Sequence, residues 1–364
     1  MAERVLLLLG PSTGGIRRHV SALAMGLAER GWEVATAGPR GVLDGLPLPS
    51  PPAVVDVPGG IDPRSLVRAR RQLAELADDV DVVHAHGLRA GWVAALAARH
   101  RPLVVTVHNV VLDEVDGRRA PMLRRVEARL PALCDAVVAV SDEIAERLAP
   151  VTPPGRLHTV PPVGPRPVAV RSAGEVRAEL GVGGAPLVVT VARLHPQKGL
   201  ATLLDAAALL VHDVRDVRVV IVGEGPLEAE LQARIEALHL DEVVQLAGSR
   251  PQAADELAAA DVVAVPSVWE SGPLVVAEAL QLGRPVVATP VGFVPRLLVD
   301  GRSARIVPAR DPAALAAALA DVLRDPAAAA AMAAEGRRAV EAELGPERLV
   351  AAIEAVYRGM LSAP

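Results

Sequence analysis

The chain has 364 residues, 51% of them hydrophobic, and a formal net charge of −5, which is enough for about two domains with separate cores. Aromatic residues make up only 1%, and no long basic arm is present, so the sequence argues against a nucleic-acid-binding protein. The single cysteine, Cys134, cannot form a disulfide within the chain, and no apolar segment approaches about 18 residues, which favours a cytoplasmic protein.

Short apolar runs alternate with longer amphipathic stretches along the whole chain and predict strands alternating with helices. The runs of the first half are Val5–Leu9, Glu33–Ala37, Val80–His84, Leu103–Val107 and Ala136–Val140. Those of the second half are Leu187–Ala192, Arg218–Val222, Val243–Ala247, Val262–Pro266, Pro285–Thr289 and Ala304–Val307. Runs that are apolar at every position indicate strands buried on both faces, so we predict doubly wound parallel sheets of the α/β class.

The densest proline region separates two well-patterned halves. Prolines gather in residues 151–155 and again in residues 160–167, where the strand–helix alternation breaks. We predict a stiff connector there and therefore two domains, 1–165 and 166–345. In doubly wound sheets, ligands bind beyond the carboxyl ends of the strands.

Three sites in the first half lie at predicted strand ends. Gly14 and Gly15 follow the first strand and would let backbone amides approach an anion, although a tight turn explains them equally well. His84-Ala85-His86 presents two imidazoles on one side, which suits a metal site or, as we favour, local hydrogen bonding. His108 ends a buried strand, and we favour a hydrogen bond to substrate over burial in the core.

Lys198 is the only lysine among 38 basic residues. It stands between a strand-like run and a helix-like run, where an ammonium group suits an anion bound at a helix N-terminus. Chance survival of one lysine in an arginine-rich composition is the alternative.

The segment from Glu270 to Glu278 follows another predicted strand. We expect Pro273 at the first helical position, a cap from Ser271 or Gly272, and a Glu278 side chain that points outward. The two carboxylates would then bracket the positive end of a helix and could accept hydrogen bonds from sugar hydroxyls. Two ordinary surface glutamates are the default interpretation of such a pair taken alone.

Taken together, these motifs resemble the retaining glycosyltransferases of family 4, a GT-B group that includes mannosyl- and N-acetylglucosaminyl-transferases. The resemblance covers nearly the whole chain. It is carried by Gly14-Gly15, His84-Ala85-His86, His108, Val140-Ser141-Asp142, Arg193, Lys198, Val222-Gly223-Glu224-Gly225-Pro226, the Glu270–Glu278 segment and Thr289-Pro290-Val291-Gly292.

This resemblance implies two Rossmann-like domains, with the nucleotide-diphosphate sugar held by the second and most of the acceptor by the first. Arg193 and Lys198 would pair with the diphosphate, and no divalent metal or cofactor is expected. Glu270 would bind the donor sugar and Glu278 the ribose hydroxyls, while His108 would reach the sugar from the first domain. The remaining implied contacts are amides at Ser271, Gly272 and Leu274 for the sugar, Gly223, Gly225 and Arg250 beside the base, and Gly14 and Gly15 near the leaving phosphate or acceptor.

Some features depart from the family pattern or leave alternatives. Ser271-Gly272-Pro273 replaces a glycine-rich triplet, and Arg296 stands where the family often has glutamate. The resemblance also implies that a last helix, within residues 346–364, crosses back to the first domain. A basic stretch at residues 117–129 is read as a solvated helix face, with contact to an anionic membrane surface or a phosphorylated acceptor as the alternative.

The competing functions are a GT-B nucleotide-sugar epimerase, a Rossmann oxidoreductase and a catalytically silent binding protein. The oxidoreductase is disfavoured because no GxGxxG follows the first strand of either half. The acceptor, the donor base and the sugar stay open at this stage.

Overall fold

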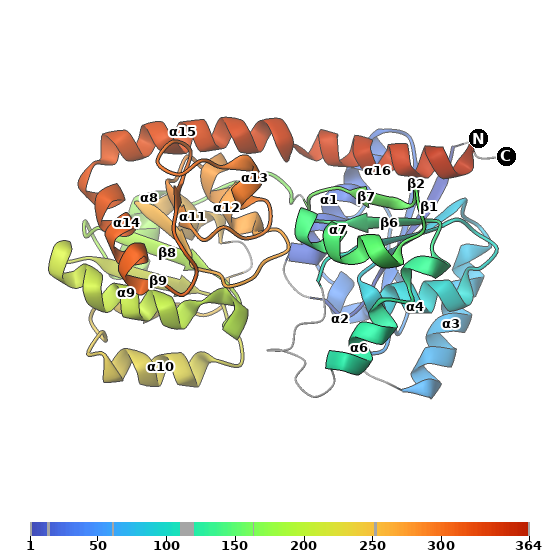
Figure 1. The fold of residues 1–364 in the computed structure, drawn as a ribbon, viewed down its shortest axis with the longest axis horizontal. Helices are drawn as coiled ribbons and strands as arrows, with labels where there is room; N and C mark the ends of the chain where they lie inside the picture. The colour runs from blue at the N-terminus through green and yellow to red at the C-terminus, as the bar shows by residue number, and fades with distance from the viewer. Residues whose placement is uncertain are drawn as a thin grey trace. The chain divides into compact units, whose positions relative to one another are not determined.

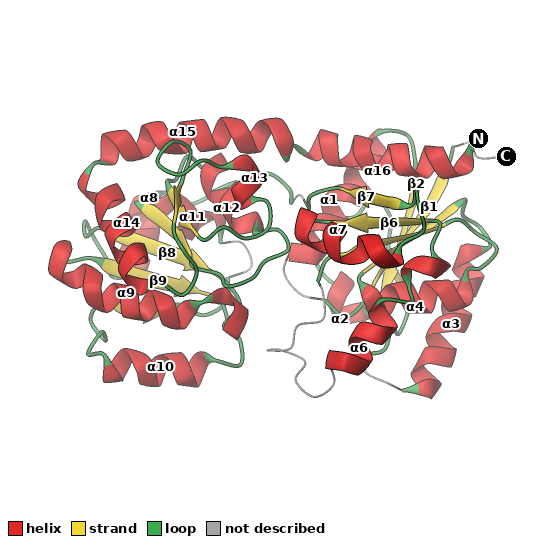
Figure 2. Ribbon diagram, in the orientation of Figure 1, coloured by secondary structure: helices red, strands yellow, loops and turns green. Residues whose placement is uncertain are grey.

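The computed structural model describes residues 2–12, 15–59, 62–109, 120–162, 164–250 and 253–362, and the chain divides into two compact units (Figure 1). Unit 1 comprises Met1–Pro165 together with Leu344–Pro364, and unit 2 comprises Arg166–Glu343. Each unit is built on one parallel sheet, and Figure 2 shows helices on either side of the strands in both. The predicted α/β class is therefore confirmed.

The sheet of unit 1 has the strand order β3-β2-β1-β4-β5-β6-β7 among the described residues, and every neighbouring pair is parallel. Its strands are β1 (Arg4–Leu9), β2 (Glu33–Gly38), β3 (Ala53–Val54), β4 (Val82–His86), β5 (Leu103–Val107), β6 (Ala136–Ala139) and β7 (Leu157–Thr159). Its helices are α1 (Gly15–Glu29), α2 (Arg40–Leu43), α3 (Pro63–Ala77), α4 (Leu88–Ala97), α6 (Ala120–Glu127), α7 (Asp142–Leu148) and α16 (Pro346–Leu361).

The sheet of unit 2 has the order β10-β9-β8-β11-β12-β13, again with parallel neighbours. Its strands are β8 (Leu187–Val191), β9 (Arg218–Val222), β10 (Val244–Leu246), β11 (Val262–Val265), β12 (Val286–Ala288) and β13 (Arg305–Ile306). Its helices are α8 (Ala173–Glu179), α9 (Leu200–Asp213), α10 (Glu228–Ala237), α11 (Ala254–Ala259), α12 (Leu274–Gln281), α13 (Val294–Leu297), α14 (Pro312–Arg324) and α15 (Pro326–Glu343).

The apolar runs predicted most of these strands but missed two short ones. β3 contains two residues, and β7 lies inside the proline-rich stretch that we expected to be only a connector. β7 pairs in parallel with β6 at the edge of the sheet, and its side chains are half-buried or exposed. Edge strands of this length carry too few apolar positions to produce a pattern in the sequence.

Helix α16, the last of the chain, packs within unit 1 against α1. Val350 occupies the space beside Gly26, where a Cβ atom would lie 2.4 Å from its Cγ2. The indole Nε1 of Trp32 donates a hydrogen bond to Glu354 Oε1 at 3.3 Å, and Tyr357 is completely buried. Both ends of the chain therefore contribute to the core of unit 1.

Candidate functional site

The carboxyl ends of four neighbouring strands of unit 2 carry the loops in which the sequence predicted a donor site. β8 is the first strand of this sheet, and the chain continues to β9 on one side of it and to β11 on the other. Such a reversal of strand order opens a crevice at the ends of the two central strands, which is the usual ligand position in doubly wound sheets. The loops that follow β8 and β11 contain Lys198 and Glu270.

Lys198 and Glu270 form an ion pair at this point through Nζ and Oε1. Their side chains are only 18% and 12% exposed. The Ser267 hydroxyl donates a second hydrogen bond to the same carboxylate oxygen at 3.1 Å. The two loops are also joined by their backbones, because the amide of Val268 donates to the carbonyl of Gln197 at 2.8 Å. Two predicted site residues far apart in the sequence are thus brought together.

Gly199, which directly follows Lys198, permits this close approach. Its φ is +66°, and a Cβ atom there would lie 2.0 Å from the carbonyl oxygen of Pro266. Only glycine combines the left-handed conformation with this backbone contact. Helix α9 begins at the next residue, so Lys198 stands in the chain directly ahead of the turn that starts a helix.

Gly223 and Gly225 pack their loop directly against the loop that carries Arg193. A Cβ atom at Gly223 would lie 1.9 Å from the carbonyl oxygen of Ala192, and one at Gly225 would lie 2.5 Å from that of Leu194. The Leu194 amide donates to the carbonyl of Glu224 at 3.0 Å. These glycines are therefore required by backbone packing, while the Arg193 side chain next to them is exposed.

The start of α12 differs from the sequence prediction. The helix begins at Leu274, and Pro273 stands one position earlier, at the N-cap, with ψ of 81° and no side-chain cap from Ser271 or Gly272. Pro273 and Gly272 instead pack against Gly292, where a Cβ atom would lie 2.7 Å from Pro273 Cδ. This packing holds the segment in a turn ahead of the helix, so the predicted cap and the first helical position were wrong.

Glu278 is buried rather than directed outward, with 7% exposure. Its helix, α12, packs against both α11 and α15, which leaves this helix little free surface. The expectation of an outward side chain was therefore wrong, because helical periodicity alone could not show that two other helices cover α12.

Arg250 does not join the Lys198–Glu270 pair through any contact among the described residues. Its guanidinium instead pairs with Glu179 at 3.1 Å and with the buried Glu256 at 3.4 Å. Arg171 bonds to Glu256 as well, at 3.0 Å. The network links α8 and α11, so its contacts in the structure are those of an ion-pair cluster within unit 2.

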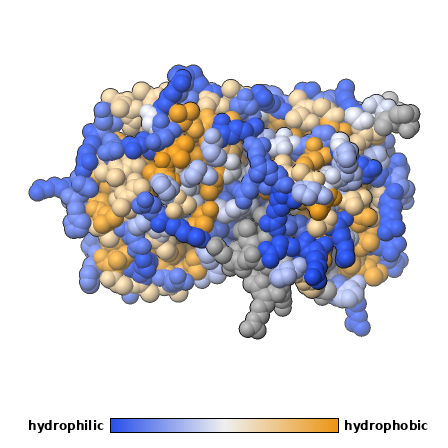
Figure 3. All heavy atoms as spheres, in the orientation of Figure 1, coloured by the Kyte–Doolittle hydropathy of each residue, from blue (hydrophilic) through white to orange (hydrophobic). Residues whose placement is uncertain are grey.

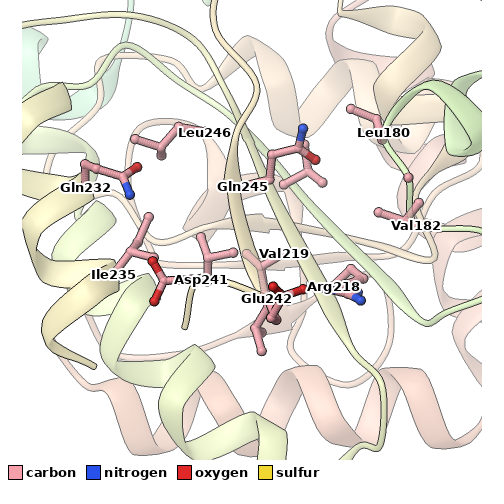
Figure 4. Close-up of a pocket in the computed structure, with 14 residues that line it drawn as sticks. Leu180, Val182, Arg218, Val219, Gln232, Ile235, Asp241, Glu242, Gln245 and Leu246 are labelled. Carbon is pink, nitrogen blue, oxygen red and sulfur yellow. The ribbon is translucent and has the colours of Figure 1, made fainter. Parts of the chain in front are cut away.

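A hollow of about 350 Å³ in unit 2 lies elsewhere (Figure 4). Arg218 at the start of β9 and Asp241 and Glu242 ahead of β10 line it. The hollow also extends along β10 to Leu246, but none of its lining residues is a predicted site residue. We therefore do not place the candidate site there.

A second group of predicted residues meets at the strand ends of unit 1. His108 directly follows β5, His86 ends β4, and His86 Nδ1 lies 3.2 Å from His108 Nε2. His19 of α1 joins them, with ring centroids 5.0 Å from His108 and 5.5 Å from His86. Sequence reasoning missed His19, which is an isolated histidine inside an amphipathic helix.

His84 is hydrogen-bonded, but its partners are distant in the sequence, whereas we favoured local hydrogen bonds at a loop start. Its Nδ1 lies 2.5 Å from the Tyr357 hydroxyl and its Nε2 lies 2.6 Å from Thr106 Oγ1. Burial, together with the smaller effect of the neighbouring His19, lowers the pKa of His84 to about 3. Burial, together with neighbouring imidazoles, also holds the pKa values of His86 and His108 well below the ordinary value. These three rings are therefore neutral at pH 7.

Two other predicted regions fall partly outside the described residues. Gly14 is not described, whereas Gly15 begins α1. Of the basic stretch, residues 117–119 are not described, and Arg125 on α6 is exposed. Figure 3 shows hydrophilic atoms over the region of α6. Among the described residues, none of the helices has both the length and the hydropathy needed to span a bilayer.

In comparisons with known proteins, each half of the chain matches a glycosyltransferase family. The family described as "Glycosyltransferase Family 4" matches residues 13–163, and "Glycosyl transferases group 1" matches residues 174–339. A D-inositol 3-phosphate glycosyltransferase of Catenulispora acidiphila is 33% identical over 97% of this chain and 92% of its own length. A GDP-mannose-dependent α-(1-6)-phosphatidylinositol monomannoside mannosyltransferase of Mycolicibacterium smegmatis is 32% identical over 69% of this chain and 72% of its own.

Solved structures of other proteins share the fold of this chain. HepE of Anabaena, in complex with UDP and glucose, has a TM-score of 0.84 at 20% identity, covering 98% of this chain and 100% of its own. Sucrose-phosphate synthase of Thermosynechococcus elongatus has a TM-score of 0.81 at 23% identity and full coverage of both chains. The chain is therefore a glycosyltransferase with the GT-B fold and belongs to glycosyltransferase family 4.

Proposed function

We propose that the protein transfers a hexose from a nucleotide-diphosphate sugar to a hydroxyl of an acceptor, with retention of the anomeric configuration. The observation that carries the proposal is the Lys198–Glu270 ion pair beyond the ends of β8 and β11, beside the start of α9. A cation and a helix N-terminus suit a diphosphate, and a carboxylate beside them suits sugar hydroxyls. Two relatives, one named a D-inositol 3-phosphate glycosyltransferase and the other a GDP-mannose-dependent mannosyltransferase, support the same chemistry.

We propose the roles predicted from the sequence for this arrangement. Unit 2 would hold the donor, with Lys198 and Arg193 on the diphosphate, Glu270 on the sugar and Glu278 on the ribose. His108, in unit 1, would contact the sugar. The further donor contacts proposed are those of Ser271, Gly272, Leu274, Gly223, Gly225 and Arg250, with Gly14 and Gly15 near the leaving phosphate or acceptor.

The chemistry needs charge stabilisation more than a protein nucleophile. Cleavage of the sugar–phosphate bond builds negative charge on the departing diphosphate, which preorganised cations and backbone amides stabilise. The acceptor would attack from the same face, and the leaving phosphate would take its proton. We assign no covalent intermediate and propose that Arg193 and Lys198 take the role that a divalent cation has in other transferases.

If a Lys or Arg side chain of unit 1 binds a phosphorylated acceptor, it is an arginine, because the only lysine of the chain lies in unit 2. Arginine forms bidentate contacts with phosphate, which lysine cannot do. Free inositol phosphates and phosphoinositides are therefore the first acceptors to test, alongside unphosphorylated glycans.

Substitution of Lys198 by methionine tests the donor site. We expect kcat to fall by about 100-fold or more, since the loss of a group that stabilises transition-state charge costs about 10²–10³. The readout is release of nucleoside diphosphate from UDP- and GDP-sugars, with and without acceptors. Arg234→Met, which breaks an exposed ion pair with Asp205 in the same unit, is the matched control.

Three outcomes separate the alternatives. Near-normal turnover of a folded Lys198→Met protein contradicts the proposed role of the lysine. Interconversion of the donor sugar without any acceptor would favour the epimerase. Failure of every nucleoside diphosphate to raise the melting temperature of the wild-type protein would exclude the donor site itself.

The basic stretch has a separate test. We retain the solvated helix face as the interpretation of residues 117–129 and contact with an anionic membrane surface as the alternative. Exposed Arg125 and Arg129 supply charge for such a contact, worth about 1 kcal/mol for each basic residue near the surface. If the alternative holds, the wild type should co-sediment with anionic but not neutral vesicles, and Arg125→Gln/Arg129→Gln should do so less. Equal sedimentation of both proteins leaves only the solvated face.

A further inference from the structure

Three histidines meet at the strand ends of unit 1, and the proposed transfer reaction gives a role to His108 but none to His19 and His86. His19, His86 and His108 come from three separate elements: helix α1, which follows β1, and the ends of β4 and β5. β1, β4 and β5 are adjacent in the sheet. The three rings are 1%, 2% and 3% exposed, so they form one buried cluster at a single edge of the sheet.

The ring nitrogens of these histidines lie close enough to share a ligand. Each residue offers one nitrogen, and the three atoms lie within 4.8 Å of one another. One pair, His86 Nδ1 and His108 Nε2, is separated by 3.2 Å. Two ligands on a tetrahedral Zn²⁺ at about 2.0–2.1 Å lie about 3.3 Å apart, so this pair already has the required spacing.

We propose that His19, His86 and His108 form a binding site for a divalent transition metal ion, with Zn²⁺ as the expected occupant. Imidazole nitrogens are the preferred ligands of this class of metal, and three of them leave a fourth coordination position for water or an anionic ligand. Mg²⁺, which requires oxygen ligands, does not suit the cluster.

The neighbouring residue His84 lends support to the ring of His86 without being a ligand itself. The two ring centroids are 4.2 Å apart, and both nitrogens of His84 already bond to Tyr357 and Thr106. A ring fixed in this way restrains the ring packed against it, and restrained ligands bind metal more tightly than mobile ones.

The site is tested by titrating metal-free protein with Zn²⁺ in competition with a chromophoric chelator. We expect one tightly bound Zn²⁺ per chain, with no competition from excess Mg²⁺. His19→Gln and His86→Gln should each weaken binding by at least about 100-fold, since loss of an outer-shell partner already costs about 10–100-fold. His100→Gln, at an exposed histidine of the same unit, should bind as the wild type does.

Absence of a tight site in the wild type, or unchanged affinity in folded His19→Gln and His86→Gln proteins, overturns the proposal. If either variant fails to fold, zinc-edge X-ray absorption of the wild-type complex decides, because three imidazole ligands are expected and one or none contradicts the site. No nucleotide sugar enters these measurements, so their result is independent of the proposed transferase activity.

Discussion

Lys198 and Glu270 illustrate how one ion pair can serve both the fold and the chemistry. Each side chain is largely removed from water, and each would be costly to leave there alone, because breaking a buried pair leaves an uncompensated charge. An incoming diphosphate would offer the ammonium a second anion, and sugar hydroxyls would offer the carboxylate new donors. The pair therefore keeps both groups in place while either one exchanges partners.

His84 makes the stability of unit 1 depend on pH. Its pKa is about 3 in the folded protein and 6.5 in the unfolded chain, so the unfolded state binds a proton first as the pH falls. The stabilisation is complete above pH 6.5 and is lost between pH 6.5 and 3. Within that window, one such histidine costs about 1.4 kcal/mol of unfolding free energy for each pH unit.

We therefore expect the unfolding free energy of the metal-free wild type to fall by about 1.4 kcal/mol through His84 between pH 7.5 and 5.5, with further losses from His86 and His108 in the same direction. Urea denaturation at the two pH values measures the change. His84→Gln should lose less than the wild type by about this amount, and His100→Gln should lose as much. A wild type whose stability is flat over this range contradicts neutral burial of the ring.

At the scale of elements, the two loops that carry the ion pair depend on Gly199. Gly199→Ala adds a methyl group that meets the Pro266 carbonyl, in addition to the strain of a left-handed alanine. Gly283→Ala is the matched control, because φ there is +72° and no heavy atom lies within 4 Å of the new Cβ. The unfolding free energy of the control should fall only by the cost of a left-handed alanine, about 1–2 kcal/mol.

The unfolding free energy of Gly199→Ala should fall by that amount and by about 1–3 kcal/mol more, because the new methyl group overpacks the site. Equilibrium denaturation of both variants measures the difference. Donor binding should weaken with it, because the Lys198 and Glu270 loops must separate. Equal losses in the two variants would show that the loops are free to move apart without cost.

The sequence predicts strands and helices where a hydrophobic pattern repeats. It does not predict features that depend on which elements pack together. Buried strands such as β5 are apolar at nearly every position, Thr106 being the exception in β5, and the predicted and observed bounds of β5 agree. Edge strand β7 has no such signal. The burial of Glu278 and the inclusion of His19 in the cluster depend on which elements become neighbours in space, and no local periodicity encodes that order.

The same physics explains which predicted site residues come together in the structure. Lys198 and Glu270 were predicted because each follows a strand, and strand ends of a parallel sheet meet at one edge. Arg250 also follows a strand, β10, but that strand lies at the outer edge of its sheet, and its guanidinium bonds to Glu179 and Glu256 instead. Lys198 and Glu270 thus follow central strands, whereas Arg250 follows an edge strand. The sequence does not reveal this difference.

At the scale of the whole molecule, the two units differ in how the chain builds them. Unit 2 is one continuous segment, whereas unit 1 requires residues from both ends of the chain. Helix α16 completes the core of unit 1 through Val350 and Tyr357, which are 2% and 0% exposed. Unit 1 therefore reaches its full stability only after the last helix has docked on α1.

The contact between Gly26 and Val350 tests this docking by a double-mutant cycle. Gly26→Ala should destabilise the wild type, although alanine favours a helix by about 1 kcal/mol, because its methyl group would lie 2.4 Å from Val350 Cγ2. Val350→Ala should cost about 2 kcal/mol, from lost burial and the space it leaves. In the double variant, the new methyl group at residue 26 fills that space.

We therefore expect the double variant to be more stable than the sum of the two single losses implies, by about 1 kcal/mol or more, as is usual for residues in direct contact. Equilibrium denaturation of the four proteins gives this coupling energy. A value near zero would mean that α1 and α16 do not meet at Gly26 and Val350, and that the first and last helices of unit 1 are held together elsewhere.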